Sequence, residues 1–192
     1  MATAFVLGNG ISRQGIDLTE LRRHGKIYGC NALYKDFEPD VLVATDRPIA
    51  EQIQRLEYAQ RKTFYTRDPI AGLGARRIPE KYWGYSSGPA AMALAALDQH
   101  AQIYLLGFDM GPTQHNKFNN VYAGAEFYKS VGATPTYTGN WRKQIAQVAE
   151  DFPTQMFIRL QGATTAAVAD FDGIENFKHV AVSEFLKQLN NG

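Results

Sequence analysis

Short apolar runs alternate with helix-like segments along this chain, and this alternation restricts its fold more than any other feature. The apolar residues of each run are mostly consecutive instead of alternating with polar ones. That pattern is typical of strands that are buried on both faces of a parallel sheet. The predicted strands are residues 3–7, 26–31, 40–46, 62–66, 102–109 and 155–160.

Helix-like segments lie between most of these runs. The clearest is residues 86–100, where Ser86 or Ser87 can cap a helix that is filled with alanine and leucine. Asp17 or Thr19 can cap an earlier helix. Strands that alternate with helices predict an α/β fold, a Rossmann-like three-layer sandwich with a mainly parallel sheet and helices on both faces. The other predicted helices are residues 16–25, 49–60, 140–152 and 181–189.

Residues 110–139 form a polar segment rich in Asn, Gly and Tyr. The segment is too long for an ordinary connection between two elements, so it is a lid or another functional loop, or it contains a short helix. We therefore expect residues 1–192 to form a single nucleotide-binding α/β domain with a lid-like loop at 110–139.

Composition excludes several classes of partner and site. The formal net charge of +1 over 192 residues gives no indication of nucleic acid or an anionic membrane as a partner. The single cysteine, Cys30, excludes an internal disulfide and a thiolate zinc cluster, which fits a reducing compartment. The chain begins without a signal-peptide pattern, and no apolar run approaches the roughly 20 residues that span a bilayer. We expect a soluble, cytoplasmic protein.

Small hydrogen-bonding residues follow most of the predicted strands. Ligands of parallel α/β sheets bind at the carboxyl ends of the strands, so these residues are candidates for one site. Each of them also has a local explanation as a turn or cap residue. The candidates are Gly8, Asn9, Gly10 and Ser12 after the first strand, Asn31 after the second, Asp46 after the third, Ser86, Ser87 and Gly88 before the alanine-rich helix, and Gly107, Phe108 and Asp109 at the fifth.

This chemistry favours a nucleotide or another anionic ligand. Glycines let backbone N–H groups approach a phosphate closely, and a helix N-terminus offers free amides with a partial positive charge. The loop GNGISRQG lacks the spacing of a dinucleotide fingerprint, and no Gly-Lys-Ser/Thr follows it as in a P-loop. An NAD site and a P-loop ATPase are therefore not expected.

Four motifs carry a resemblance to a known family: VLGNGIS, YGCNALY, SSGPAAMALAAL and IYLLGFD, in that order. Their order resembles that in the bacterial CMP-sialic-acid-dependent sialyltransferases of glycosyltransferase family 42, and in the related group of motility accessory factors and an archaeal 6-hydroxymethylpterin pyrophosphokinase. The resemblance also suggests a phage-encoded modification enzyme. It implies a CMP-type nucleotide held by Asn9, Gly10, Asn31, Asp46, Ser87 and Gly88 near residues 107–109, with Tyr122 and Tyr128 at its phosphate.

The chain departs from that family at the catalytic base. The sialyltransferases carry a histidine just before the helix that follows the lid, whereas this chain has Gly139 and Asn140 in TYTGNWRKQ. His115 in the lid is one substitute as a base, and a carboxylate, Asp109 or Asp46, is another. Arg142, beside Lys143, is a candidate to neutralise a leaving phosphate.

Three functions remain open at this point. The first is a nucleotide-sugar-dependent glycosyltransferase whose acceptor the sequence does not name. The second is a metal-dependent pyrophosphokinase-like transferase, in which Asp46 and Asp109 would hold Mg²⁺. The third is a non-catalytic protein that binds or sequesters a nucleotide. The expected ligand is a nucleotide or a CMP-type nucleotide-sugar, and Mg²⁺ is expected only for the second function.

Overall fold

The computed structural model describes residues 2–192 and contains one sheet of eight strands. The strand order is β5-β4-β3-β2-β1-β6-β7-β8, and every neighbouring pair is parallel. The predicted, mainly parallel sheet is thus confirmed. The strands are β1 (Thr3–Leu7), β2 (Lys26–Cys30), β3 (Val41–Val43), β4 (Thr63–Thr66), β5 (Arg76–Arg77), β6 (Gln102–Leu106), β7 (Met156–Gln161) and β8 (Phe177–Ala181).

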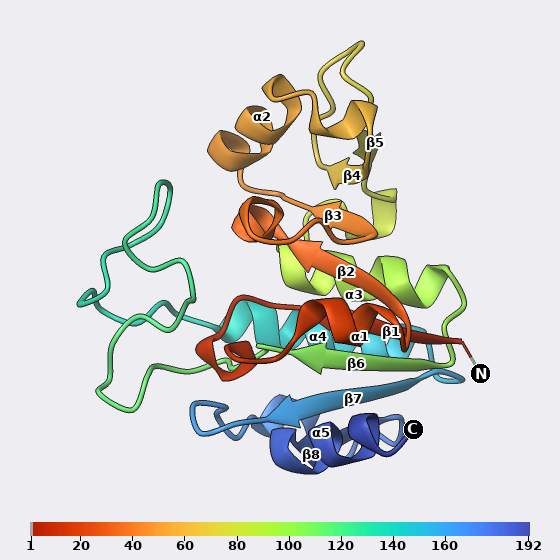
Figure 1. The fold of residues 1–192 in the computed structure, drawn as a ribbon, viewed down its shortest axis with the longest axis vertical. Helices are drawn as coiled ribbons and strands as arrows, with labels where there is room; N and C mark the ends of the chain where they lie inside the picture. Colours follow the sequence, from red (N-terminus) through yellow and green to blue (C-terminus); the bar gives the residue numbers. More distant parts are fainter. Residues whose placement is uncertain (1) are drawn as a thin grey trace.

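Helices cover both faces of this sheet, which confirms the three-layer architecture (Figure 1). Side chains alternate along β1, so Ala4 and Val6 pack with α3 and α4 while Phe5 and Leu7 pack with α1 and α5. A third cluster joins α2 to Leu42 and Phe64 on the face of α1 and α5. The helices are α1 (Leu18–Arg22), α2 (Arg47–Arg55), α3 (Ser87–Leu97), α4 (Gly139–Asp151) and α5 (Val182–Asn190).

The strand order reverses between β1 and β6. These strands pair in register from Thr3 with Gln102 to Leu7 with Leu106, although about a hundred residues separate them. The chain leaves β1 toward α1 on one face of the sheet and leaves β6 toward α4 on the other. A crevice at the carboxyl ends of β1 and β6 follows from this topology, and such switch points are where open α/β sheets bind ligands.

Several element boundaries differ from the sequence expectation. The short edge strand β5 lies in a region expected to be a loop, and β8 was not predicted. Residues 110–138 contain neither helix nor strand, so the helix that this segment could have hidden is absent. Asp17 does cap α1, because its carboxylate accepts hydrogen bonds from the backbone N–H groups of Thr19 and Glu20.

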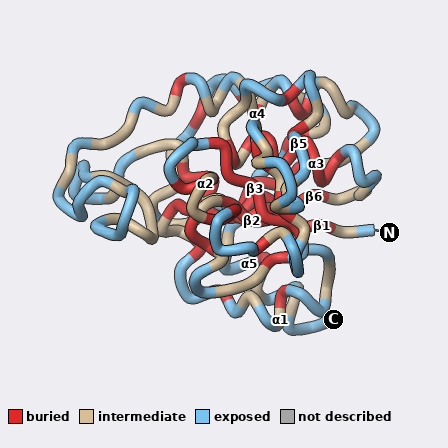
Figure 2. Tube along the Cα trace, turned by 90° about the horizontal axis from the view of Figure 1, so that it is seen from above, coloured by how far each residue is buried: buried red, intermediate tan, exposed pale blue. Residues whose placement is uncertain are grey.

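Burial is greatest along the central strands and lowest in the loop after β6 (Figure 2). The carboxyl ends of the strands point toward that loop, so the switch point lies beneath it (Figure 1). Among residues 2–192, no helix is both long enough and apolar enough to cross a membrane.

Candidate functional site

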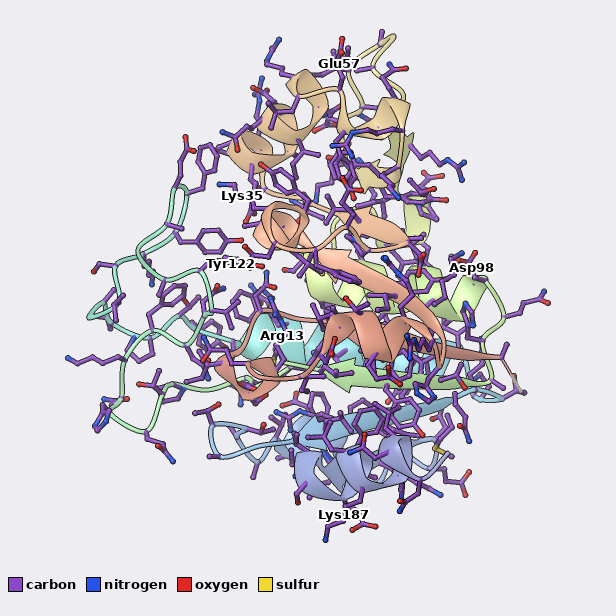
Figure 3. All side chains as sticks on the ribbon, in the orientation of Figure 1. Arg13, Lys35, Glu57, Asp98, Tyr122 and Lys187 are labelled. Atoms are coloured by element: carbon purple, nitrogen blue, oxygen red, sulfur yellow. The ribbon has the colours of Figure 1, made fainter. Side chains whose placement is uncertain are left out.

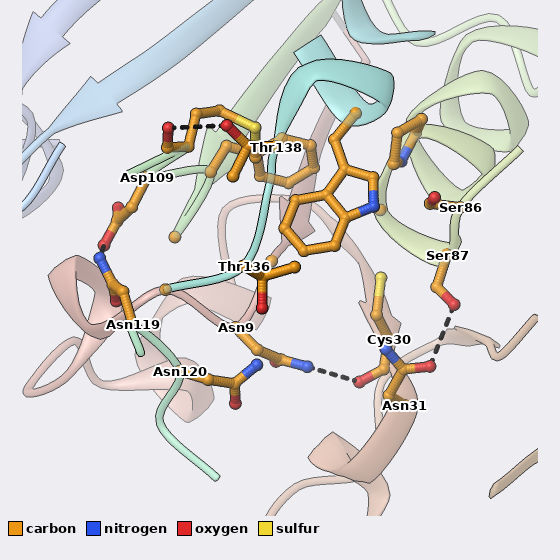
Figure 4. A pocket seen from close by; sticks show the side chains of 18 of the residues that line it. Asn9, Cys30, Asn31, Ser86, Ser87, Asp109, Asn119, Asn120, Thr136 and Thr138 are labelled. Carbon is orange, nitrogen blue, oxygen red and sulfur yellow. Dashed lines mark hydrogen bonds between the residues drawn. The ribbon is translucent and has the colours of Figure 1, made fainter. Parts of the chain in front are cut away.

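A pocket of about 210 Å³ opens at the carboxyl edge of the sheet, at the switch point between β1 and β6 (Figure 4). Residues from seven separate segments of the chain meet there. The pocket gathers eleven of the residues singled out from the sequence: Gly8, Asn9, Gly10, Asn31, Asp46, Ser86, Ser87, Gly88, Gly107, Phe108 and Asp109.

Close packing of two backbone turns forms one side of the pocket. A Cβ atom on Gly8 would lie 2.7 Å from the carbonyl oxygen of Gly107, and a Cβ atom on Gly10 would lie 2.5 Å from Cγ of Asp109. Gly107 itself has φ +71°, a conformation that favours glycine. Protein atoms therefore fill the space beside Gly8 and Gly10. These glycines allow the two turns to pack closely, and they do not leave an empty space for a ligand.

Asp109 lies between these turns and is 2% exposed. Its carboxylate accepts hydrogen bonds from both the backbone N–H and the hydroxyl of Ser12, and from the Asn119 amide at 3.1 Å. The hydroxyls of Thr164 and Thr165 donate to it at 2.8 and 3.3 Å. An ionised carboxylate offers about four lone-pair sites, so five donors occupy its capacity. Ser12 lies outside the pocket lining and acts here as a partner of Asp109.

A second buried charge, Arg159 on β7, supports the end of β6. Its guanidinium donates to the carbonyl oxygens of Phe108 at 2.8 Å, Ala166 at 2.9 Å and Asp109 at 3.0 Å. Burial lowers the pKa of Arg159 to about 10, against the opposing field of the Asp109 carboxylate. The arginine thus fixes the backbone that carries Phe108 and Asp109.

The opposite side of the pocket is built around Ser87 at the start of α3. The Ser87 hydroxyl lies 3.0 Å from the backbone N and from Oγ1 of Thr45, and it donates to Oδ1 of Asn31 at 3.0 Å. Ser86 occupies the N-cap position but makes no side-chain cap bond. Asn31 has φ 54°, a left-handed conformation that Asn tolerates better than most residues. The hydrogen bonds of Ser87 hold β2, β3 and α3 together at this corner.

The start of α3 leaves room for a ligand. The first N–H groups of a helix have no acceptor within it, and they attract anions. The carboxamide of Gln144 accepts from the N–H of Ser86, which lies just before α3. A Cβ atom added to Gly88 would meet only ordinary contacts, the nearest at 3.5 Å on the Phe108 ring. Gly88 therefore differs from the glycines of the opposite side, which the protein itself crowds.

The pocket lining includes two carboxylates, Asp46 and Asp109, and no lysine, arginine or histidine side chain. Asp46 occupies the N-cap position of α2, makes no side-chain cap bond there and is exposed. Within residues 2–192, no group of three or more His, Cys, Asp or Glu side chains is placed to hold a metal ion. Anion binding in this pocket would thus depend on backbone amides and neutral donors.

The loop after β6 covers the pocket, and we call residues 110–138 the lid. Half of its eight lining residues have polar side chains, and Asn119 is bonded both to Asp109 and to the N–H of Ile11. The hydroxyl of Thr138 donates to the carbonyl oxygen of Met110 at 3.1 Å and so closes the base of the lid. The lid residues that line the pocket are Met110, Gly111, Phe118, Asn119, Asn120, Pro135, Thr136 and Thr138.

Tyr122 and Tyr128 belong to the lid but lie outside the pocket lining, packed against the cluster that contains α2. Tyr128 accepts a hydrogen bond from the N–H of Ala32 at 3.3 Å. Burial raises the pKa of Tyr122 to about 12 and also raises that of Tyr128. Both phenols therefore remain neutral hydrogen-bonding groups at neutral pH.

Of the three predicted catalytic residues, Asp109 lines the pocket, whereas His115 and Arg142 do not. His115 is exposed in the lid, and the four histidines of the chain, all in the described part, are absent from the pocket. Arg142 is half-buried on α4, and its Nε is buried without a partner among residues 2–192. Its neighbour Trp141 does line the pocket. At the position where the resemblance predicts a histidine, Gly139 is buried and Asn140 is exposed.

Sequence reasoning missed several residues of the site. Thr45 lies next to Asp46 at the predicted end of the third strand, although Asp46 alone was chosen as a candidate there. Trp141 was not among the candidates, because an aromatic residue on a helix packs in the core as readily as it contacts a ligand. Arg13 and Arg159 carry no signal of burial, because arginines are mostly exposed in proteins.

Comparisons with known proteins support the fold. No family model matches the chain, and no curated protein matches it by sequence. The chain is similar to solved structures of the sialyltransferase CstII from Campylobacter jejuni. With the CMP-3FNeuAc complex it shares 13% identity and a TM-score of 0.52, over 99% of each chain. With the cytidine-5'-monophosphate complex it shares 16% identity and a TM-score of 0.50, over 83% of this chain and 79% of that one.

A third CstII structure, in complex with a trisaccharide acceptor and CMP, gives 13% identity and a TM-score of 0.52 over 99% of each chain. At these identities the similarity shows only that the chain shares the α/β fold of CstII, whose three structures hold cytidine-5'-monophosphate, CMP-3FNeuAc, or CMP with a trisaccharide acceptor.

Proposed function

We propose that this protein is a nucleotide-sugar-dependent glycosyltransferase that binds a CMP-type nucleotide at the carboxyl edge of its sheet. One observation carries the proposal: the small polar residues that follow separate strands converge on one pocket at the switch point, under a lid. Local turn chemistry alone would not require them to meet. The fold similarity to CstII in complex with CMP supports the choice of nucleotide.

In this proposal the phosphate lies at the N-terminus of α3, next to Gly88. That position offers unpaired backbone amides, the positive end of the helix dipole and no competing side chain. The amides of Asn9 and Asn31 contact the nucleotide from the ends of β1 and β2. The lid residues Asn119, Asn120 and Thr136 close over the donor and exclude water, which limits hydrolysis of the sugar-nucleotide bond.

We assign the role of general base to Asp46 and a positioning role to Asp109. Five donors already occupy the Asp109 carboxylate, so it is poorly placed to take a proton from an acceptor hydroxyl. Asp46 lines the pocket with an exposed carboxylate that makes no cap bond. It would accept the proton of the acceptor hydroxyl as that oxygen attacks the anomeric carbon, and CMP would leave as a phosphate monoester.

Ligand binding is tested first, by thermal shift and calorimetry with CMP, CDP, UDP and GDP, each with and without Mg²⁺. We expect stabilisation by CMP above the other nucleotides. No stabilisation by any of them would contradict the site.

Turnover is tested next, as release of CMP from a CMP-sugar. Asp46→Asn is expected to keep CMP affinity and to lose turnover by about 100-fold or more, in the range of a general base. Asp172→Asn, which changes an exposed carboxylate away from the pocket, is the matched control and should behave as the wild type. Production of AMP from ATP would instead favour the pyrophosphokinase-like alternative.

A second candidate function, nucleotide binding without turnover, is favoured by one observation. The pocket lining contains no histidine, and the carboxylate of Asp109 is fully bonded within the protein. For this candidate the wild type would bind CMP and release none from a CMP-sugar, and Asp46→Asn would have no activity to lose.

A further inference from the structure

Arg13 is a buried cation directly behind the pocket. It lies three residues after Gly10, is 8% exposed and does not line the pocket itself. Its Nε donates to the carbonyl oxygen of Gly8 at 2.7 Å. One of its terminal nitrogens donates to Oδ1 of Asn9 at 3.1 Å and to the hydroxyl of Tyr122 at 3.3 Å. All three acceptors are uncharged oxygen atoms, so the guanidinium serves to hold neutral groups in place.

The bond from Arg13 determines which end of the Asn9 amide faces which neighbour. A guanidinium can only donate, so the Asn9 atom beside it must be the oxygen. A backbone carbonyl can only accept, so the atom beside the Cys30 carbonyl, at 3.3 Å, must be the nitrogen. One N–H of Asn9 is used by Cys30 and the other is left for the pocket. Asn9 can therefore donate this second N–H to a hydrogen-bond acceptor on a ligand in the pocket.

The same residues connect the turn after β1 to the lid. The N–H of Val121 donates to the carbonyl oxygen of Asn9 at 2.8 Å, and the N–H of Ile11 donates to Oδ1 of Asn119 at 2.8 Å. The Tyr122 ring lies 5.8 Å from the Arg13 guanidinium. Figure 3 labels Arg13 and Tyr122, which lie near each other where the lid meets the turn after β1. A side chain that fixes Asn9 thus also holds the lid at residues 119–122.

We propose that Arg13 is a positioning residue that sets the Asn9 amide to donate into the pocket and, through Tyr122, couples that orientation to the closed position of the lid. The ligand side of this inference rests on the proposed nucleotide site. The connection between Arg13, Asn9 and the lid is a property of the free protein and is tested without a ligand.

Hydrogen exchange of the free protein, followed by NMR, tests the lid connection. In Arg13→Met the Val121 amide should exchange about tenfold faster or more, while amides in the central strands keep their wild-type rates. Arg13→Lys replaces the guanidinium, which makes three hydrogen bonds, with a single ammonium group. It should therefore also accelerate exchange of the Val121 amide. Tyr122→Phe removes only one hydroxyl and should have a smaller effect of the same sign. Arg23→Met, which changes an exposed arginine of the next helix, is the matched control.

Affinity for CMP, measured on the same variants, tests the positioning role. Arg13→Met and Arg13→Lys should weaken CMP binding about tenfold or more, as expected for loss of a charge-assisted bond. Tyr122→Phe should weaken it less, and Arg23→Met should not change it.

Two results would overturn the inference. One is wild-type exchange at Val121 in both Arg13 variants; the other is accelerated exchange combined with wild-type CMP affinity. If the wild type itself binds no CMP, the nucleotide proposal fails on its own, and the exchange rates in the free protein still decide the connection between Arg13 and the lid.

Discussion

Two of the regions that line the pocket, its floor and its lid, are held in different ways. The floor, residues 8–10 and 107–109, consists of two turns packed backbone against backbone, with the Asp109 side chain between them and Arg159 bonded to the carbonyl oxygens of Phe108 and Asp109. The lid, residues 110–138, has no helix or strand and reaches the floor through hydrogen bonds from the N–H of Val121 to the carbonyl oxygen of Asn9 and from the Asn119 amide to Asp109. Three of the six large hydrophobic side chains that are exposed in residues 2–192 lie in the lid: Phe127, Val131 and Tyr137.

The floor and the lid should therefore respond differently to substitution. The floor positions its groups rigidly, because any added atom meets backbone. The lid can change position at low cost, because few of its contacts are buried. Substitutions in the floor should therefore change stability, and substitutions in the lid should change ligand exchange more than stability.

The largest effect is expected from Gly10→Val. A Cβ atom at this position would lie within 2.6 Å of Asp109 and of the Gly107 carbonyl, so both turns must move apart. We expect a loss of about 3–4 kcal/mol in the free energy of unfolding, measured with denaturant. Gly84→Val is the matched control, because a Cβ atom there meets no other atom within 4 Å. Equal stability of the two variants would show that the floor is not rigid.

Asp109→Ala should follow in size. The substitution leaves the donors of Ser12, Asn119, Thr164 and Thr165 without their acceptor in a buried site. We expect a loss of about 2–3 kcal/mol, because unsatisfied buried donors retain their desolvation penalty. Differential scanning calorimetry measures the change. A variant as stable as the wild type but inactive would instead favour a direct catalytic role for Asp109.

Gly88→Ala separates ligand contact from stability on the opposite side of the pocket. A Cβ atom fits there with ordinary contacts, and alanine favours a helix over glycine by up to about 1 kcal/mol. We expect unchanged or higher stability together with about tenfold weaker CMP binding, because the methyl group occupies the place of the phosphate. Calorimetric titration measures the affinity of the wild type and of the variant for CMP. An unchanged affinity in the variant would mean that the phosphate does not bind next to Gly88.

In the lid, Tyr128→Phe should cost about 1 kcal/mol or less, since it removes one hydrogen bond to the N–H of Ala32. The exchange rate of the Ala32 amide should rise while the melting temperature changes little. A loss of stability as large as that in the floor variants would remove the distinction between the two regions.

The smallest effect is expected at the opposite edge of the sheet, where Tyr28 is hydrogen-bonded to both Asp98 and His100. Burial, and next the nearby charge of Lys26, lower the pKa of His100. The unfolded chain, with a pKa of about 6.5, then binds more protons than the folded one, so stability falls as the pH drops below about 6.5. His100→Gln should flatten this part of the stability profile, and an unchanged profile would assign the acid sensitivity to other groups.

Most of the fold and of the floor could be predicted because their signals are local. The apolar runs that became β1, β2, β3, β4, β6 and β7 carry their burial in consecutive residues, and parallel strands bring their carboxyl ends to one edge. The edge strands β5 and β8 were not predicted. β5 consists of only two arginines, and in β8 only Phe177 is buried, so neither strand has a run of apolar residues or a regular alternation. Edge strands pair on one side only, so their composition is less restricted.

The amino-acid pattern alone was enough to predict the parallel sheet, its helices and the small polar residues at the strand ends. The roles of those residues depend on contacts that form only in the folded chain. Ser12 meets Asp109 across 97 positions, and Arg13 meets Tyr122 across 109. Such pairs follow from the strand order and from the path of the lid, and no local periodicity encodes them. For that reason the same Asp109 that the sequence offered as a base is, in the folded chain, the acceptor that holds the floor and the lid together.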